Sequence, residues 1–340
     1  MYMRGGGQRH QHRLIVGVYV DDLVITGGDL DELKQFKEEM KSTFQMADLG
    51  LLQYYLGLEV SQDEDGITVR QRAYALKILA AAGLVGCNPS HVPMESRLKL
   101  SKSSTAPLVD ATEYRRIVGA LRYLVNTRPD LAYAVGYVSR FMEKPTTEHL
   151  LAVKKVLRYI AGTVDYGCCY GRKKGGDVLI GYSDSDLAGD IDTRKSTTGV
   201  FFFLNGNLVT WQSQKQRVVA LSSCEAEYIA AATAVCQGIW LSRLLTEFKG
   251  EVEADPFTLK IDNQSAIQLS RNPVFHDRSK HIDTKFHFIR QCVEEGRVNL
   301  EHVDTGSQLA DILTKSLGRD HFVELRTRLG LVKISEGRQA

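Results

Sequence analysis

Residues 177–211 read DVLIGYSDSDLAGDIDTRKSTTGVFFFLNGNLVTW, and they decide the fold of the second half of this chain. The apolar run at 177–185 predicts a strand that ends in acidic residues. The dipeptide Asn205-Gly206 lies between two further apolar runs, 199–204 and 207–211. Both residues accept the positive φ angles of a type I′ turn, so this segment predicts a β-hairpin. Three strands therefore open the second unit of the chain.

Helices and strands alternate after this hairpin. We predict an extension of the sheet at 218–221 and then a long helix from 222 to about 248. The remaining predicted elements are strands at 257–262 and 297–303 and helices at 263–271, 277–296 and 307–317. Strands followed by interleaved helices and strands indicate an α/β (α+β) fold with a mixed sheet.

The first half of the chain carries a separate set of predicted elements. The run LIVGVYVDDLVIT (14–26) predicts two short strands around a turn at Asp21-Asp22, and Asp29 can cap a helix over 30–44. Further predicted elements are strands at 51–60 and 66–69, a helix at 74–82, a linker at 87–112, and two helices within 113–163 that are broken at Arg128-Pro129-Asp130. We expect residues 1–13 to be a disordered or truncated start, because they are polar and Gly-rich.

The overall composition is that of a globular protein. The 340 residues are 43% hydrophobic and 25% charged, and their formal net charge is +2. This excludes a histone-like basic protein but leaves room for a local basic groove. No apolar run reaches the roughly 18 residues of a membrane helix, so we expect no membrane partner. Six scattered cysteines without a CxxC pair indicate an intracellular protein with reduced thiols.

Four acidic residues fall where predicted elements of the second unit end or begin. Asp184 lies near the end of the first strand, Glu227 in the first turns of the long helix, Asp262 at the end of a later strand, and Asp311 in the first turns of the last helix. Such positions converge on one rim of a mixed sheet, where clustered carboxylates repel one another. Two Mg²⁺ ions about 3.5–4 Å apart would relieve this repulsion and could catalyse phosphodiester hydrolysis.

Local spacing favours Glu227 over its neighbour Glu225 as the functional acid. The two residues lie two apart on a helix, so their side chains point to nearly opposite sides. Ser222 and Glu225 fit a capping box, which assigns Glu225 to the start of the helix. Glu227 is then free to face the sheet, and small residues follow it on about the same face: Ala231, Ala234 and Gly238.

The other three acids each have a simpler interpretation. Asp184 and Asp186 could both be turn residues, and their spacing on a strand does not choose between them. Asp262 could cap the helix that begins at residue 263. Asp311 lies four residues before Lys315 and could form a surface ion pair with it. The occurrence of all four acids on suitable elements in a suitable order nevertheless favours a metal site.

Eleven motifs resemble those of copia-type LTR-retrotransposon Pol polyproteins, and they occur along the chain in the order that the family has. The second half is similar to their ribonuclease H domain in YSDSDLAGD (182–190), RKSTTGVFFFLNG (194–206), the run 211–216, SSCEAEYIAA (222–231), IDNQSAI (261–267), KHIDTKFHFIR (280–290) and QLADILTK (308–315). The first half resembles the end of their reverse transcriptase in YVDDLVITG (19–27), DLGLLQYYLGLEV (48–60), YRRIVGALRYLVNTRPDLAYAV (114–135) and the run 149–162.

This resemblance implies an RNase H-like mixed sheet with helices on both faces. It also implies metal-dependent cleavage of the RNA strand of an RNA–DNA hybrid with two Mg²⁺ or Mn²⁺ ions. By motif, the four metal-binding acids correspond to Asp184, Glu227, Asp262 and Asp311, and a histidine thought to assist product release corresponds to His302. The residues expected to contact the phosphates of the hybrid are Arg278, Lys280, His281 and Lys285.

The resemblance also implies a domain organisation. It assigns 14–86 to a partial reverse-transcriptase palm and thumb, 87–172 to a linker and helical connection, 175–332 to the RNase H-like domain and 333–340 to a tail. Asp21 and Asp22 would be the remnant of the polymerase turn. A complete polymerase needs a third Asp and the fingers, and the thirteen residues before 14 contain no acid. We therefore expect polymerisation to be absent or supplied within a longer polyprotein.

Other functions remain as alternatives. The chain could be a non-catalytic nucleic-acid-binding module, with a steep salt dependence of binding, or an inactive relic of a truncated element. A zinc site is not expected, because the spacings of His276, His281, His287 and Cys292 do not place two ligands on one helical face. The expected partners are a hybrid nucleic acid and the rest of a Pol polyprotein, and the oligomeric state is left open. The expected location is intracellular, in the cytoplasm, a virus-like particle or the nucleus.

Overall fold

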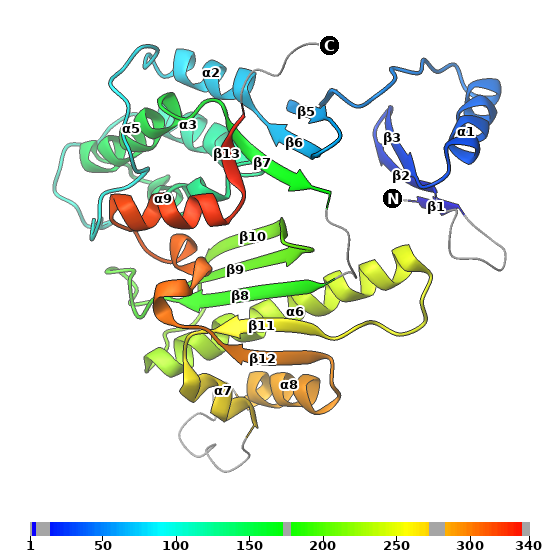
Figure 1. Ribbon diagram of the computed structural model, residues 1–340. Helices are drawn as coiled ribbons and strands as arrows, with labels where there is room; N and C mark the ends of the chain where they lie inside the picture. Colours follow the sequence, from blue (N-terminus) through cyan, green and yellow to red (C-terminus); the bar gives the residue numbers. More distant parts are fainter. Residues whose placement is uncertain (1, 5–13, 173–177, 272–282, 335–340) are drawn as a thin grey trace.

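A five-stranded mixed sheet forms the centre of the second half of the molecule (Figure 1). The computed structural model describes residues 2–4, 14–172, 178–271 and 283–334, without the side chains of 2–4 and 283–286. The strands lie in the order β10-β9-β8-β11-β12, and β9 is antiparallel to both of its neighbours while β11 is parallel to both of its own. Their bounds are β8 (Leu179–Ser185), β9 (Thr197–Leu204), β10 (Asn207–Lys215), β11 (Phe257–Ile261) and β12 (Val298–His302). The predicted α/β (α+β) fold with a mixed sheet is confirmed.

The β9–β10 hairpin has the predicted turn. Asn205 and Gly206 have φ angles of 51° and 75°, as a type I′ turn requires. The prediction that 218–221 extends the sheet is wrong, because the chain leaves β10 at Gln216. The buried amide of Gln216 donates to the hydroxyls of Ser185 and Thr198 and to the carbonyl of Ala226, which joins the end of the sheet to the helix that follows.

One face of the sheet is covered by α6 (Ser223–Lys249), with α7 (Gln264–Arg271) and α8 (Asp283–Glu294) beside it (Figure 1). Ser222 caps α6 by accepting from the backbone N–H of Glu225 at 3.2 Å, as predicted. By length and composition α6 could cross a membrane, but half of its most apolar window is buried in this core. We therefore interpret α6 as the core helix of this layer.

Gly238 permits α6 to approach the sheet. A Cβ atom at this position would lie 2.3 Å from Cζ of the buried Phe257. We expect Gly238→Ala to lower the denaturant midpoint, because an overpacked core costs about 1–3 kcal/mol, which exceeds the gain in helix propensity. Gly119→Ala is the matched control, since Gly119 is exposed on a helix with no atom within 4 Å of the added Cβ. The control should raise the midpoint, and equal shifts for both variants would contradict this account of the α6 packing.

The opposite face is covered by a helical unit. It comprises α2 (Arg72–Ala81), α3 (Ala111–Leu124), α4 (Ala132–Val138), α5 (Thr147–Ala161) and the later helix α9 (Arg319–Arg328). Phe201 and Phe203 of β9 pack into this helical core, whereas Val200 and Phe202 pack against the α6 layer. The core therefore crosses the domain boundary predicted near residue 175.

A second five-stranded sheet joins distant parts of the chain. Its order is β13-β7-β6-β5-β4, and its adjacent strands are antiparallel. The bounds are β4 (Tyr54–Tyr55), β5 (Leu58–Gln62), β6 (Gly66–Arg70), β7 (Tyr166–Gly171) and β13 (Leu331–Lys333). The single strand predicted at 51–60 is wrong, because a turn at Leu56-Gly57, with φ angles of 49° and 77°, divides it.

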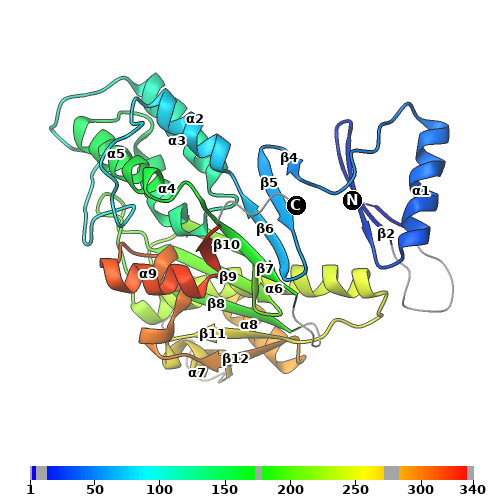
Figure 2. The same ribbon diagram turned by 45° about the horizontal axis from the view of Figure 1, so that its top comes forward.

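The first described residues form a third sheet beside a helix, away from α3, α5 and α9 in both views (Figure 1 and Figure 2). It consists of β1 (Tyr2–Arg4), β2 (Leu14–Tyr19) and β3 (Asp22–Gly27), followed by α1 (Leu30–Thr43), which Asp29 caps as predicted. The β2–β3 turn lies at Val20-Asp21, one residue earlier than predicted, since Tyr19 pairs with Asp22. The expectation of disorder is wrong for Tyr2–Arg4, because their backbone pairs with the edge of β2. Residues 1 and 5–13 lie outside the described part.

Two helix predictions also need correction. The segment 113–163 contains three α-helices rather than two, with short turns η1 (Pro129–Leu131) and η2 (Ser139–Phe141), because α5 starts anew at its cap Thr146. The helix predicted at 307–317 is replaced by the 3-10 turns η5 (Thr305–Ser307) and η6 (Leu309–Leu313). Gln308 is extended between them and its side chain caps η6, which interrupts the helix. The helix α9 and the strands β7 and β13 were not predicted.

A buried ionic network joins the helical unit to α9. Arg128 donates to both carboxylate oxygens of Asp130, at 2.9 and 2.8 Å, and also to Thr163. Tyr159 of α5 donates to Asp130 at 2.6 Å and accepts from Arg326 of α9 at 2.9 Å. The side chains of Arg128 and Asp130 are 2% and 0% exposed, so the pair depends entirely on its protein partners.

Candidate metal centre

The structure brings the four predicted acids to one edge of the mixed sheet. Asp184 lies near the end of β8, opposite Gly199 of β9, and Asp262 directly follows the adjacent parallel strand β11. Glu227 lies near the start of α6, and Asp311 lies in η6. Asp184, Glu227 and Asp311 are buried, whereas Asp262 is half-buried.

Three of these carboxylates converge. One oxygen each from Asp184, Glu227 and Asp262 lies within 4.8 Å of the others. Asp311 lies outside this group of three but interacts with Asp184 through its charge. We call the four residues the acidic cluster, with Asp184 as the member that links the other three.

Burial and mutual repulsion favour protonated carboxyl groups in this cluster. Burial, followed by the charge of Asp311, raises the pKa of Asp184 to about 6. Burial, together with the charges of Asp184 and Asp262, raises the pKa of Glu227 to about 10. The pKa of Asp262 is also raised, first by burial and then by Asp184. Ionising Asp184, Glu227 and Asp262 together therefore requires additional positive charge.

The donor set suits a hard divalent cation. Oε1 of Glu227 accepts from the backbone N–H of Ser185 at 3.0 Å. Its Oε2 is buried and has no hydrogen-bond partner in the described part of the chain. A buried oxygen without a partner beside two further carboxylate oxygens is an arrangement that Mg²⁺ or Mn²⁺ would satisfy. The residues present thus fit the ions that the sequence resemblance implied.

Two side chains that the sequence did not single out position the cluster. Gln308 is fully buried; it donates to the carbonyl of Ser183 at 2.9 Å and accepts from the N–H of Ala310 at 3.2 Å. It therefore ties the residue before Asp184 to the residue before Asp311. The hydroxyl of Thr314 donates to the Asp184 carboxylate. Both residues lie in the motif QLADILTK, which was the available signal.

A glycine allows η6 to lie close to the sheet. A Cβ atom on Gly199 would come within 2.8 Å of Cβ of Leu313 and Cγ2 of Thr314. Gly199 is the register partner of Asp184, so the absence of its side chain sets how near Asp311 can come to that carboxylate.

Two basic side chains adjoin Asp311. Nζ of Lys315 lies 2.8 Å from its Oδ1, so the alternative ion pair does form, but Asp311 is buried rather than on the surface. Although burial opposes it, the charge of Asp184 and the bond to Asp311 raise the pKa of Lys315. Nε2 of His321 lies 3.9 Å from Oδ2. His321 was missed because it lies on α9, which the sequence analysis did not predict.

The structure places differently two pairs of neighbouring side chains between which the sequence did not choose. The group of three contains Asp184, whereas the Asp186 carboxylate accepts from the backbone N–H of Thr197. The cap of α7 is Asn263, which accepts from the N–H of Ala266 at 3.0 Å, rather than Asp262. Asp262 is therefore available to the cluster.

The remaining predicted residues lie elsewhere or are not described. His302 is exposed at the end of β12, in register with Ile261, the residue before Asp262. Asp21 and Asp22 are exposed on the β2–β3 hairpin, on the opposite side of Figure 1 from the ends of β8 and β11. Arg278, Lys280 and His281 lie outside the described residues, and Lys285 lies on α8 without a described side chain.

Comparisons with known proteins identify the family of this chain. Residues 1–96 match the family model described as reverse transcriptase (RNA-dependent DNA polymerase). The chain is 42% identical over 328 residues to the retrovirus-related Pol polyprotein from transposon RE1 of Arabidopsis thaliana. This match covers 96% of the chain and 22% of the RE1 polyprotein. It is 32% identical to a putative transposon Ty5-1 protein of Saccharomyces cerevisiae, over 66% of this chain and 73% of that protein. The chain belongs to the copia-type retrotransposon Pol family.

Within the copia-type Pol family, this chain corresponds to a portion that includes reverse-transcriptase sequence at residues 1–96. It spans about a fifth of the length of the RE1 polyprotein. Among solved structures, LC11-RNase H1 from a compost metagenome matches with 17% sequence identity and a TM-score of 0.32, over 41% of this chain and 93% of that one.

Proposed function

We propose that this copia-type Pol portion hydrolyses the RNA strand of RNA–DNA hybrids at the acidic cluster, with two divalent metal ions. The observation that carries the proposal is the convergence of Asp184, Glu227 and Asp262 within 4.8 Å of one another. These residues lie where parallel strands and the start of α6 meet, and Oε2 of Glu227 is buried without a partner in the described structure. Such a site is costly to ionise without bound cations.

The acidic cluster and the residues around it have different tasks in this reaction. Asp184, Glu227, Asp262 and Asp311 would hold the ions, and when bound the ions supply an activated water and stabilise the leaving oxygen. The N–H of Ser185 fixes the rotamer of Glu227, and the hydroxyl of Thr314 fixes Asp184. We propose that His302, exposed beside the strand that leads to Asp262, assists product release.

Cleavage of a hybrid with labelled RNA in Mg²⁺ tests this function. We expect the wild type to cut the RNA strand and Asp262→Asn to be at least about a thousand-fold slower, because it loses an anionic metal ligand. Hybrid binding should survive in the variant, since Asp262 is half-buried and does not cap α7. Equal cleavage by both proteins would contradict the proposal. A folded wild type that binds the hybrid without cutting it would instead support the binding-module alternative.

A further inference from the structure

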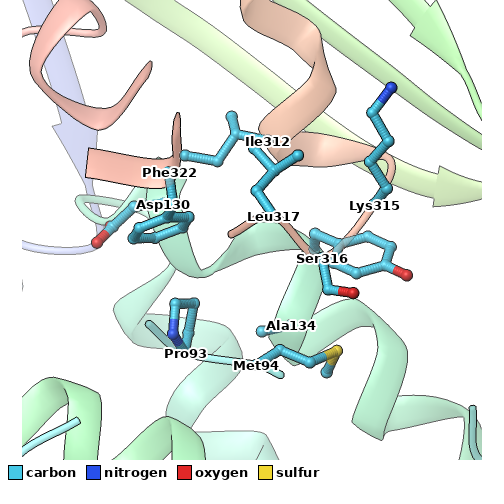
Figure 3. A pocket seen from close by; sticks show the side chains of 10 residues that line it. Pro93, Met94, Asp130, Ala134, Ile312, Lys315, Ser316, Leu317 and Phe322 are labelled. Carbon is cyan, nitrogen blue, oxygen red and sulfur yellow. The ribbon is translucent and has the colours of Figure 1, made fainter. Parts of the chain in front are cut away.

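A strap of the chain, residues 93–104, runs from the helical unit to the edge of the acidic cluster. The backbone N–H of Arg97 donates to the hydroxyl of Ser316 at 3.1 Å, and Ser316 directly follows Lys315. Pro93 and Met94 line the same small cavity as Lys315 and Ser316 (Figure 3). Residues predicted to be a linker therefore lie beside a cation of the site.

Asp192 fastens this strap to the loop between β8 and β9. The hydroxyl of Ser101 donates to one carboxylate oxygen of Asp192 at 2.5 Å, and the backbone N–H of Lys102 donates to the other at 2.8 Å. The loop itself starts just after Asp184, at the end of β8. The strap and the loop thus form one continuous border next to the acidic cluster.

This border carries five cations, which we call the cationic rim: Arg97, Lys99, Lys102, Arg194 and Lys195. Four of them are exposed and Lys195 is half-buried. None forms an ion pair within the ranges that the structure describes, because nearby acids are engaged elsewhere. Glu95 pairs with Lys155 at 3.1 Å, and Asp190 pairs with Lys215 at 3.0 Å and Arg140 at 3.3 Å.

We propose that the cationic rim binds the phosphodiester backbone of the nucleic acid whose RNA strand enters the acidic cluster. This inference rests on the proposed nuclease function and assigns part of its substrate contact to the strap of the helical unit. Four clustered carboxylates repel a polyanion, so the site needs adjacent positive charge to attract one. Unpaired, exposed Lys and Arg side chains provide this charge and release counterions from the duplex on binding.

Binding of an RNA–DNA hybrid across a range of salt concentrations tests the rim in the Asp262→Asn background, which excludes turnover. The variant Lys99→Gln/Lys102→Gln/Arg194→Gln should bind at least ten-fold more weakly at 0.1 M salt. A plot of log affinity against log salt concentration should be less steep by about 2–3, because each lost phosphate contact reduces the magnitude of the slope by about 0.9. The fastening to Asp192 is retained, since it uses Ser101 and a backbone N–H.

Arg243→Gln is the matched control. Arg243 is exposed on α6, and its place sixteen residues beyond Glu227 puts it about 24 Å along the helix from the cluster. If the triple variant binds the hybrid with the same affinity and salt slope as this control, the proposal is overturned and the cationic rim would be assigned to another acidic partner. If the triple variant does not fold by circular dichroism, Arg194→Gln alone should reduce the slope by about 1.

These results separate the rim from the proposed function. A wild type that fails to cleave the hybrid, while the rim variant still loses affinity and slope, would refute the nuclease and retain the rim as a nucleic-acid contact. A wild type that cleaves, with unchanged binding in the rim variant, would retain the nuclease and refute the rim.

Discussion

Asp184→Asn is expected to slow hybrid cleavage by at least about a thousand-fold, which corresponds to about 4 kcal/mol of activation free energy. The same substitution should raise the melting temperature of the metal-free protein at pH 8. Asp184 is buried, and burial and the charge of Asp311 raise its pKa to about 6, so at pH 8 it is held in an unfavourable ionised state. Asparagine removes this charge and retains an oxygen that can accept from Thr314. Melting curves without metal, recorded beside the cleavage assay, check both effects.

Asp186→Asn is the control for the cleavage part of this prediction. Asp186 lies two residues further along, is half-buried, and accepts from the N–H of Thr197 rather than joining the group of three. We expect it to cleave at a rate close to that of the wild type. A fall in melting temperature for Asp184→Asn would show that Asp184 has a structural role, and equal loss of cleavage in both variants would show that the cluster is assigned incorrectly.

Arg128→Met is expected to lower the free energy of unfolding by about 3–5 kcal/mol. The substitution leaves the carboxylate of Asp130 buried without its bidentate partner, and it removes two donors to Thr163. Tyr159 would remain as a donor to Asp130, which is too little to offset a buried charge. Denaturant unfolding followed by circular dichroism measures the effect.

Arg116→Met provides the comparison for this loss. Arg116 also makes a close pair, with Glu113 at 2.6 Å, but the two side chains are 52% and 46% exposed. Solvent screens such a pair, so its removal should change the free energy of unfolding by less than about 1 kcal/mol. Similar losses for the two variants would contradict the distinction between the buried and the exposed pair.

Much of the fold could be predicted because local chemistry and tertiary packing agree there. Asn205-Gly206 specifies its turn through its own φ angles, and Ser222 specifies the start of α6. The errors occur where long-range packing decides. The strand β13 forms only because its backbone finds β7, and η6 is short because Gln308 uses its side chain on Ser183 and Ala310. No periodicity in the sequence encodes such partners.

The acids of the candidate site could be predicted because each lies at the end or start of a regular element. The supporting residues could not be ranked from the sequence, since the role of Thr314 depends on the distance between η6 and β8. The strap was expected to be a linker, because its lack of periodicity does not reveal that Met94 and Leu100 are buried. The spacing of motifs therefore predicts the charged residues of the site more readily than it predicts the contacts that position them.

The pairing of β13 with β7 has a consequence for synthesis on the ribosome. Roughly 160 residues separate the two strands. At a synthesis rate of about 5–20 residues per second, β13 is therefore made about 8–30 s after β7. During this time one edge of the sheet β7-β6-β5-β4 is open to other strands. The helical unit also lacks Phe322 and Leu325 of α9 from its core until then. The sheet and the helical unit of the first half are therefore complete only after α9 and β13 have emerged, and until then the open strand edge is a site where aggregation can start.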